Sequence, residues 1–134
     1  MREIKFRAWD HEDKKMWKVV GITEPIWGDC EEAHIRVCEF HENPSKKETD
    51  VRMSVDYELM QCSGLIDIKG NEIFEKDLIK DDENFIWEVF YKQGAFYAKC
   101  TDLMAEQLLS SINLFGVVIG NIYENPELLE GANH

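Results

Sequence analysis

The alternation of apolar and polar side chains at the start of the chain has the period of a β-strand. Residues 4–9 read IKFRAW, in which apolar and basic side chains alternate up to Trp9, and a two-residue period places successive side chains on opposite faces of a strand. The polar stretch DHEDKK at 10–15 separates this run from a second apolar run, MWKVVGI at 16–22. Two such strands with a short polar connection predict a β-hairpin.

A polar stretch in the middle of the chain is the best linker candidate. Residues 41–50, HENPSKKETD, contain no aliphatic side chain and are rich in loop-forming residues. A strand is expected before them at 35–40. After them, residues 51–59, VRMSVDYEL, give the clearest alternating pattern in the chain. We expect a single domain over residues 1–134, with a subdivision into an N-terminal β region (1–40), the linker (41–50) and a barrel region (51–134).

The second half of the chain predicts short strands and a second hairpin. The runs FIWEVFY at 85–91 and AFYAKC at 95–100 flank Lys92-Gln93-Gly94, and Gly94 accepts the positive φ that a three-residue hairpin loop requires. Seven or eight short strands in the whole chain favour a mainly β fold with a small barrel in the second half. The remaining strands are predicted at 72–74, 78–80 and 115–119.

One or two short helices complete the expected fold class, which is mainly β with minor α. Asp102 can accept hydrogen bonds from first-turn N–H groups, and apolar residues follow it at spacings of three and four as far as Ser111. Near the end of the chain, Asn125 is a good cap for a last helical turn. Pro126 stands after it, where its missing N–H costs nothing.

Negative charge is concentrated in the second half of the chain. The whole chain has a formal net charge of -12; residues 1–54 carry 10 Lys+Arg and 12 Asp+Glu, whereas residues 55–134 carry 5 and 15. Nucleic-acid binding depends on cations that displace phosphate counterions, so residues 55–134 are unsuited to it. A basic protein partner fits this half better, and the same charge also serves solubility.

No targeting or membrane signal is visible in the sequence. No apolar run approaches the ~20 residues that a membrane helix requires, and no signal-like apolar block follows the first residues. We expect no membrane association and a cytoplasmic location. The cysteines contain no Cys-x-x-Cys pair and are expected to be reduced. They are Cys30, Cys38, Cys62 and Cys100.

Two residue groups resemble metal-binding patterns, and neither is convincing. Asp56, Asp67 and Lys69 loosely fit the spacing by which nucleases hold a divalent cation, but the Lys-Gly-Asn sequence at 69–71 is strong turn material. A second group has zinc-ligand residue types at spacings too wide for one ion. Its members are Cys30, His34, Cys38 and His41.

The sequence contains no phosphate-binding glycine loop and no nucleophile elbow. We expect no cofactor, no bound metal and no catalytic residue.

Aromatic side chains are abundant for a small β protein, and they can serve either a core or a contact face. Small barrels bind peptides or single strands through exposed aromatic residues, but such residues more often form the core. The core interpretation is favoured. The candidate contact residues are Arg7, Trp9, Tyr91 and Phe96.

Three stretches taken together resemble the YopX family of phage and prophage proteins. Their order and spacing match that family over nearly the whole chain, apart from residues 23–54. The resemblance implies a mainly β fold with an SH3-like barrel in the second half, carried on a mobile genetic element. It implies no activity, cofactor or catalytic residue. The stretches are IKFRAWD at 4–10 with KKM at 14–16, LMQCSGL at 59–65 leading into 67–79, and VIGNIYENPELL at 118–129.

The central stretch departs from the family pattern at two positions. Lys69 replaces an Asn, and Lys76 replaces a Gly that would suit a tight turn with positive φ. The matching residues are Gly70, Glu72, Ile73, Glu75 and Asp77.

We interpret the acidic residues between 67 and 77 as structural. Residues 67–71 are expected to form a turn around Gly70, residues 72–74 a short strand, and residues 75–77 a second turn in which the Asp77 carboxylate accepts backbone N–H groups.

The leading functional hypothesis is a non-enzymatic phage or prophage accessory protein that binds a host or phage protein in the cytoplasm of the bacterial host. The alternative is a nucleic-acid-associated protein that uses the basic N-terminal strand around Lys5 and Arg7, and a metal-dependent nuclease is the third hypothesis. Exposed strand edges in a small β protein also make self-association reasonable.

Overall fold

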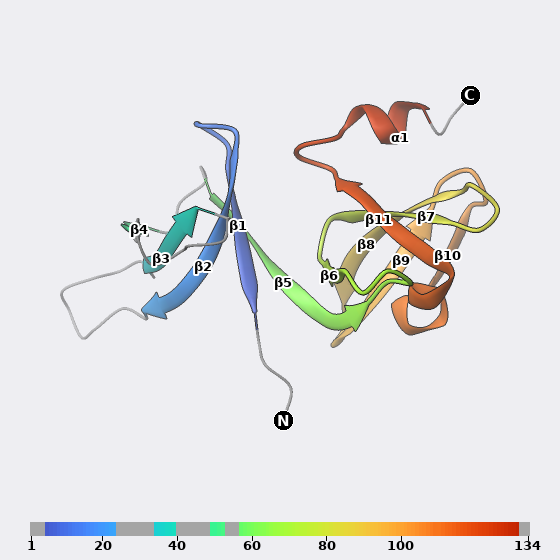
Figure 1. Cartoon of the computed structure of the whole chain (residues 1–134), viewed down its shortest axis with the longest axis horizontal. Helices are drawn as coiled ribbons and strands as arrows, with labels where there is room; N and C mark the ends of the chain where they lie inside the picture. The colour runs from blue at the N-terminus through green and yellow to red at the C-terminus, as the bar shows by residue number, and fades with distance from the viewer. Residues whose placement is uncertain (1–4, 24–33, 40–48, 53–56, 132–134) are drawn as a thin grey trace. The chain divides into compact units, whose positions relative to one another are not determined.

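The structure is a computed structural model that describes residues 5–23, 34–39, 49–52 and 57–131. The chain divides into two compact units, Lys5–Gln61 and Cys62–His134, called the N-terminal unit and the C-terminal unit below. Strand β5 (Tyr57–Ile66) belongs to both, because its first half pairs with β1 and its second half with β6 (Figure 1).

The N-terminal unit is an antiparallel sheet, and it confirms the first predicted hairpin. Asp10 lies opposite Lys15 where β1 and β2 pair. Its Oδ1 accepts hydrogen bonds from the N–H groups of Glu12 and Asp13 at 3.0 and 3.2 Å, which stabilises the turn. Ala8 is fully buried in the small core of this unit. The strands pair in the order β4-β3-β2-β1-β5, with bounds β1 (Phe6–Asp10), β2 (Lys15–Thr23), β3 (His34–Glu39) and β4 (Thr49–Arg52).

The predictions for residues 35–59 are only partly within the described chain. The strand expected at 35–40 is β3. The strand expected at 51–59 corresponds to the end of β4 and the start of β5, and residues 53–56 lie outside the described residues. The expected linker also lies outside them, except for Thr49 and Asp50, which pair with β3. A subdivision at residues 41–50 therefore stays a prediction.

The C-terminal unit contains a second, five-stranded antiparallel sheet with the order β10-β9-β8-β7-β11. Together with the N-terminal sheet, it confirms the mainly β fold class. The short helix expected after Pro126 is α1, which begins at Glu127. The bounds are β6 (Glu72–Phe74), β7 (Asp77–Asp81), β8 (Ile86–Lys92), β9 (Ala95–Cys100), β10 (Ala105–Leu108), β11 (Gly116–Asn121) and α1 (Glu127–Gly131), with 3-10 turns η2 (Leu109–Ser111) and η3 (Asn113–Phe115).

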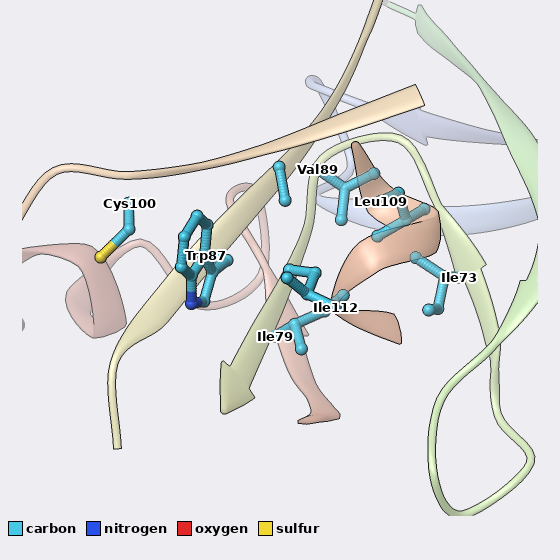
Figure 2. Close-up of a cluster of buried hydrophobic side chains, with 8 residues drawn as sticks. Ile73, Ile79, Trp87, Val89, Cys100, Leu109 and Ile112 are labelled. Atoms are coloured by element: carbon cyan, nitrogen blue, oxygen red, sulfur yellow. The ribbon is translucent and has the colours of Figure 1, made fainter. Parts of the chain in front are cut away.

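One apolar cluster forms the core of the C-terminal unit (Figure 2). Alternation along β8 turns Trp87 and Val89 inward, where they are 3% and 0% exposed, as a strand with one buried face requires. The core interpretation of the aromatic residues therefore holds for Trp87, whereas Tyr91 at the end of the same strand is 49% exposed. The cluster comprises Ile73, Ile79, Trp87, Val89, Ala98, Cys100, Leu109 and Ile112.

The helix predicted from Asp102 to Ser111 is wrong. A turn follows Cys100, with the N–H of Met104 donating to the carbonyl of Thr101 at 3.1 Å, and β10 then pairs with β9 in register. Met104 has a φ of 49°, outside the right-handed helical region. Antiparallel pairing with the preceding strand β9 overrides both features that supported the helix, which were Asp102 as a cap and the apolar spacing after it.

The hairpin between β8 and β9 is confirmed, but its loop is one residue shorter than predicted. Lys92 pairs with Ala95, so the loop is Gln93-Gly94. Their φ values of 50° and 84° are both positive, which is the pattern of a type I′ turn.

The turn before β7 places a lysine where the backbone favours glycine. Lys76 has a φ of 70°. Its N–H donates to the carbonyl of Val89 at 2.8 Å, and its carbonyl accepts from the N–H of Ile122 at 3.1 Å. These two bonds hold the residue in a conformation that costs a non-glycine residue about 1–2 kcal/mol.

Substituting Lys76 with glycine is expected to stabilise the protein. Relief of the left-handed strain exceeds the added flexibility of the unfolded chain, so Lys76→Gly should increase the free energy of unfolding by about 0.5–1 kcal/mol. Urea denaturation measures this difference. Lys69→Gly is the matched control, because Lys69 is an exposed turn lysine that is absent from the positive-φ residues, and it should reduce stability. Equal effects of the two substitutions would contradict the strain at Lys76.

Candidate functional site

The Asp67 carboxylate is the centre of a turn and is almost completely buried, with 1% exposure. Its Oδ1 accepts from the backbone N–H groups of Lys69 and Asn71 at 2.9 and 2.8 Å. Its Oδ2 accepts from the Asn71 side-chain amide at 3.0 Å and from the N–H of Val118 in β11 at 2.8 Å. Both oxygens are thus occupied, and they attach the turn to the sheet. Gly70, with a φ of 86°, completes the turn.

The hydrogen bonds around Asp67 shift its acidity. Burial alone would raise the pKa of the carboxyl group, but the bonds from Val118, Asn71 and Lys69 favour the charged form and together hold the pKa below its ordinary value of 3.8. The group is therefore an anion over the whole neutral range.

Asp77 holds the next turn. It is 2% exposed, and its Oδ2 accepts from the N–H of Phe74 at 2.8 Å. This is the kind of contact that the sequence predicts for Asp77, between a carboxylate and the backbone three residues earlier.

Asp81 repeats the Asp67 arrangement fourteen positions later. Its Oδ1 accepts from the N–H groups of Glu83 and Phe85, both at 2.9 Å, and its carbonyl accepts from the N–H of Asn84 at 3.1 Å. Asn84 has a φ of 70° and so takes the place of Gly70. The difference lies in Oδ2, which accepts from the indole N–H of Trp87 at 2.8 Å. The sequence indicates a charged loop at residues 81–84, but not that the Asp81 carboxylate closes it, although an Asp followed three residues later by Gly or Asn is a readable signal.

Asn121 and Asn125 hold the chain between β11 and α1. The side-chain oxygen of Asn121 accepts from the N–H groups of Tyr123 and Glu124 at 3.0 and 2.8 Å. The side-chain oxygen of Asn125 accepts from the N–H of Asn121 at 3.2 Å, and its backbone carbonyl accepts from the N–H of Leu128 at 3.1 Å. Asn125 thus joins the turn before it to the start of α1.

A pocket with a volume of about 300 Å³ opens beside the Asp81 turn. Its apolar lining includes the nearly buried Trp87 and the exposed side chains of Leu103 and Phe115, which are 44% and 61% exposed. Acidic side chains on the Asp81 turn form one part of its wall. The complete lining is Asp81, Asp82, Glu83, Phe85, Trp87, Leu103, Gln107, Ser111, Ile112 and Phe115.

The acidic residues of this pocket differ in whether their carboxylates accept hydrogen bonds from the protein. The Asp81 carboxylate is committed to three donors within its own turn and β8. Asp82 and Glu83 are exposed, and no ion pair or side-chain hydrogen bond holds their carboxylates within the described residues. The pocket therefore combines apolar surface with two carboxylates that can receive a cation.

The predicted contact residues are divided between the two compact units. Arg7 and Trp9 belong to the N-terminal unit and are 8% and 5% exposed. Tyr91 and Phe96 pair across the β8–β9 hairpin of the C-terminal unit, with ring centroids 5.0 Å apart in an edge-on arrangement. Of the four, only Tyr91 is a strongly exposed side chain.

No group of three His, Cys, Asp or Glu side chains in the described part of the chain is placed to hold a metal ion. For the predicted nuclease pattern, Asp56 lies outside that part, and Asp67 directs both oxygens at N–H donors. No helix among the described residues is long and apolar enough to span a membrane.

The structure defines a mainly β protein whose turns are held by buried aspartates. The YopX family model, described as "YopX protein", matches residues 5–130, and the chain belongs to this family. It is 24% identical over 139 residues to the SPbeta prophage-derived uncharacterized protein YopX of Bacillus subtilis (strain 168), with 95% of this chain and 96% of that protein covered.

Protein EF1440 from Enterococcus faecalis has a similar crystal structure. The TM-score is 0.62 and the sequence identity 30%, over 96% of this chain and 99% of that one.

Neutralising Asp67 is expected to destabilise the protein in a pH-dependent way. Asp67→Asn turns an amide N–H₂ toward N–H donors, which should cost about 1–3 kcal/mol at pH 7. Because the folded-state pKa is lowered from 3.8, the wild-type advantage is fully present above that value and is lost as the pH falls through the folded-state pKa. Denaturation curves of both proteins should therefore converge below pH 3.8.

The control for this series is Asp102→Asn, which removes an exposed carboxylate from the β9–β10 turn. Its stability should follow that of the wild type at neutral pH. An Asp67→Asn protein that is as stable as the wild type at pH 7 would show that the turn does not depend on the carboxylate.

Proposed function

We propose that this chain is a phage or prophage accessory protein that acts without catalysis in the cytoplasm of a bacterial host, and that its C-terminal unit binds a partner protein. The prophage origin stated for the Bacillus subtilis relative supports the first part. The observation that carries the second part is the pocket beside the Asp81 turn, where exposed apolar side chains and unpaired carboxylates meet.

The large apolar side chains that are exposed at this pocket indicate a surface that contacts another molecule. Single exposed apolar residues are normal, but a group that lines a concavity marks an interaction site. Leu103 and Phe115 line the pocket, and Met104, which is 93% exposed, follows Leu103 in the same turn. The acidic wall repels phosphate groups, so a protein partner fits this surface better than a nucleic acid.

We also propose that the C-terminal unit is an SH3-like barrel. A barrel requires that the ends of its sheet be joined. In this unit the loop after β5 reaches β11 through two hydrogen bonds, from the N–H of Ile68 to the carbonyl of Gly116 at 3.1 Å and from the N–H of Val118 to Asp67. These bonds support closure between the β5–β6 pair and the edge strand β11.

Affinity capture with a pocket variant tests the binding proposal. Tagged wild-type protein should recover a partner from host lysate at low and moderate salt. Phe115→Ser should reduce that recovery by about tenfold, as expected when an aromatic side chain that the partner covers is removed. Recovery is measured by quantitative mass spectrometry. Thermal melting verifies that the variant, which changes an exposed side chain, remains folded.

Tyr91→Ser is the matched control, because Tyr91 is an exposed aromatic residue on the β8–β9 hairpin and does not line the pocket. It should leave recovery unchanged. Repeated capture of nothing would contradict the binding function. Loss of the partner with Tyr91→Ser but not with Phe115→Ser would place the contact on the hairpin instead.

A further inference from the structure

We propose that the pocket receives an arginine side chain from an extended, partly apolar segment of the partner protein. The inference rests on the proposed function and adds the chemistry of the residue that is recognised. It depends on three features of the pocket: its free carboxylates, the aromatic side chains that line it, and its exposed apolar side chains.

The two free carboxylates of the pocket are held in place by the turn that carries them. Asp82 and Glu83 lie within the loop that the Asp81 carboxylate closes, and the N–H of Glu83 itself donates to Asp81 at 2.9 Å. The backbone that carries the two acids is therefore fixed before any ligand arrives, which lowers the entropic cost of binding. Adjacent carboxylates on a fixed backbone suit a cation with several donors.

The aromatic wall of the pocket includes Phe85, whose backbone N–H donates to Asp81 in the same turn. Trp87, whose indole N–H donates to Asp81 at 2.8 Å, is only 3% exposed, so the rings that a ligand can reach are those of Phe115, which is 61% exposed, and the half-buried Phe85. A guanidinium group stacks on aromatic rings and also forms paired hydrogen bonds with carboxylates. An ammonium group acts as a point charge and uses only part of this arrangement, so arginine fits the pocket better than lysine.

The opening of the pocket predicts the character of the residues beside the arginine. Leu103 and Phe115 are exposed at the pocket, and Met104 follows Leu103, so apolar neighbours of the arginine would cover surface that is otherwise in water. Gln107, another lining residue, belongs to β10 at one edge of the five-stranded sheet. An extended segment can lie along an edge strand while one of its side chains enters the pocket.

The negative charge of the protein disfavours a second copy of the chain or an anionic ligand in the pocket. The whole chain has a net charge of -12, so two copies repel each other, and phosphate or carboxylate ligands meet Asp82 and Glu83. At about 300 Å³, the pocket is at the lower limit of small-molecule sites, which suits a single side chain.

Titration of labelled protein with short blocked peptides tests the inference. The probe is acetyl-Leu-Arg-Leu-amide, and the comparison peptide has citrulline in place of arginine, which keeps the shape and removes the charge. Proton–nitrogen NMR spectra should show saturable shifts at the amides of Glu83, Leu103 and Phe115 and at the Trp87 indole. Binding should weaken about tenfold for the citrulline peptide and also on raising the salt concentration.

Two double variants separate the local acids from the overall charge. Asp82→Asn with Glu83→Gln should reduce the affinity for the arginine peptide about tenfold. Glu12→Gln with Asp13→Asn removes the same charge from exposed residues of the N-terminal unit and should leave the affinity unchanged. Equal binding of the two peptides, shifts that lie outside the pocket, or equal loss in both double variants would each overturn the inference.

The result can be distinguished from a failure of the proposed function. If a captured partner depends on Phe115 but the arginine peptide does not bind, the protein-binding function stands and the arginine inference is wrong. Self-association in sedimentation experiments that is abolished by Asp82→Asn with Glu83→Gln would assign the pocket to a second copy and would also overturn the inference.

Discussion

The fold of the C-terminal unit depends on aspartate carboxylates that satisfy the N–H groups of its turns. Short strands need many turns, and the N–H groups at those turns have no partner in the sheet ladders. Asp67 and Asp81 each accept from the N–H groups two and four residues ahead. Burying the Asp67 carboxylate is costly, but its four charge-assisted hydrogen bonds offset that cost. The half-buried Asp81 fixes the shape of its loop with three.

The two equivalent turns use their second carboxylate oxygen differently, and this difference separates architecture from function. In Asp67 it accepts from the backbone of β11, so the turn connects distant parts of the unit. In Asp81 it accepts from the Trp87 indole, so the turn orients a side chain that lines the pocket. The same local geometry thus connects strands in one place and forms part of a pocket in the other.

Features with an unambiguous local pattern were predictable from the sequence, whereas an ambiguous local pattern and a site assembled from separate segments were not. The first hairpin and the β8–β9 hairpin follow from alternation and turn residues. The strand β10 was mistaken for a helix although it pairs with the preceding strand β9, because Asp102 and the apolar spacing after it also fit a helix. The pocket combines residues from the Asp81 turn, the β9–β10 turn and η3, and no spacing rule brings these segments together.

The acidic residues in the second half of the chain are of two kinds, those that hold turns and those whose carboxylates are free, and the net charge alone does not distinguish them. One group of acids accepts hydrogen bonds from N–H groups, so these carboxylates are less available to a cation. Its members are Asp67, Asp77 and Asp81. Asp82 and Glu83 follow Asp81 directly and have no such commitment among the described residues. Hydrogen-bonded and free acids are therefore adjacent at one point beside an apolar pocket, and Asp81 fixes the backbone that carries the free ones.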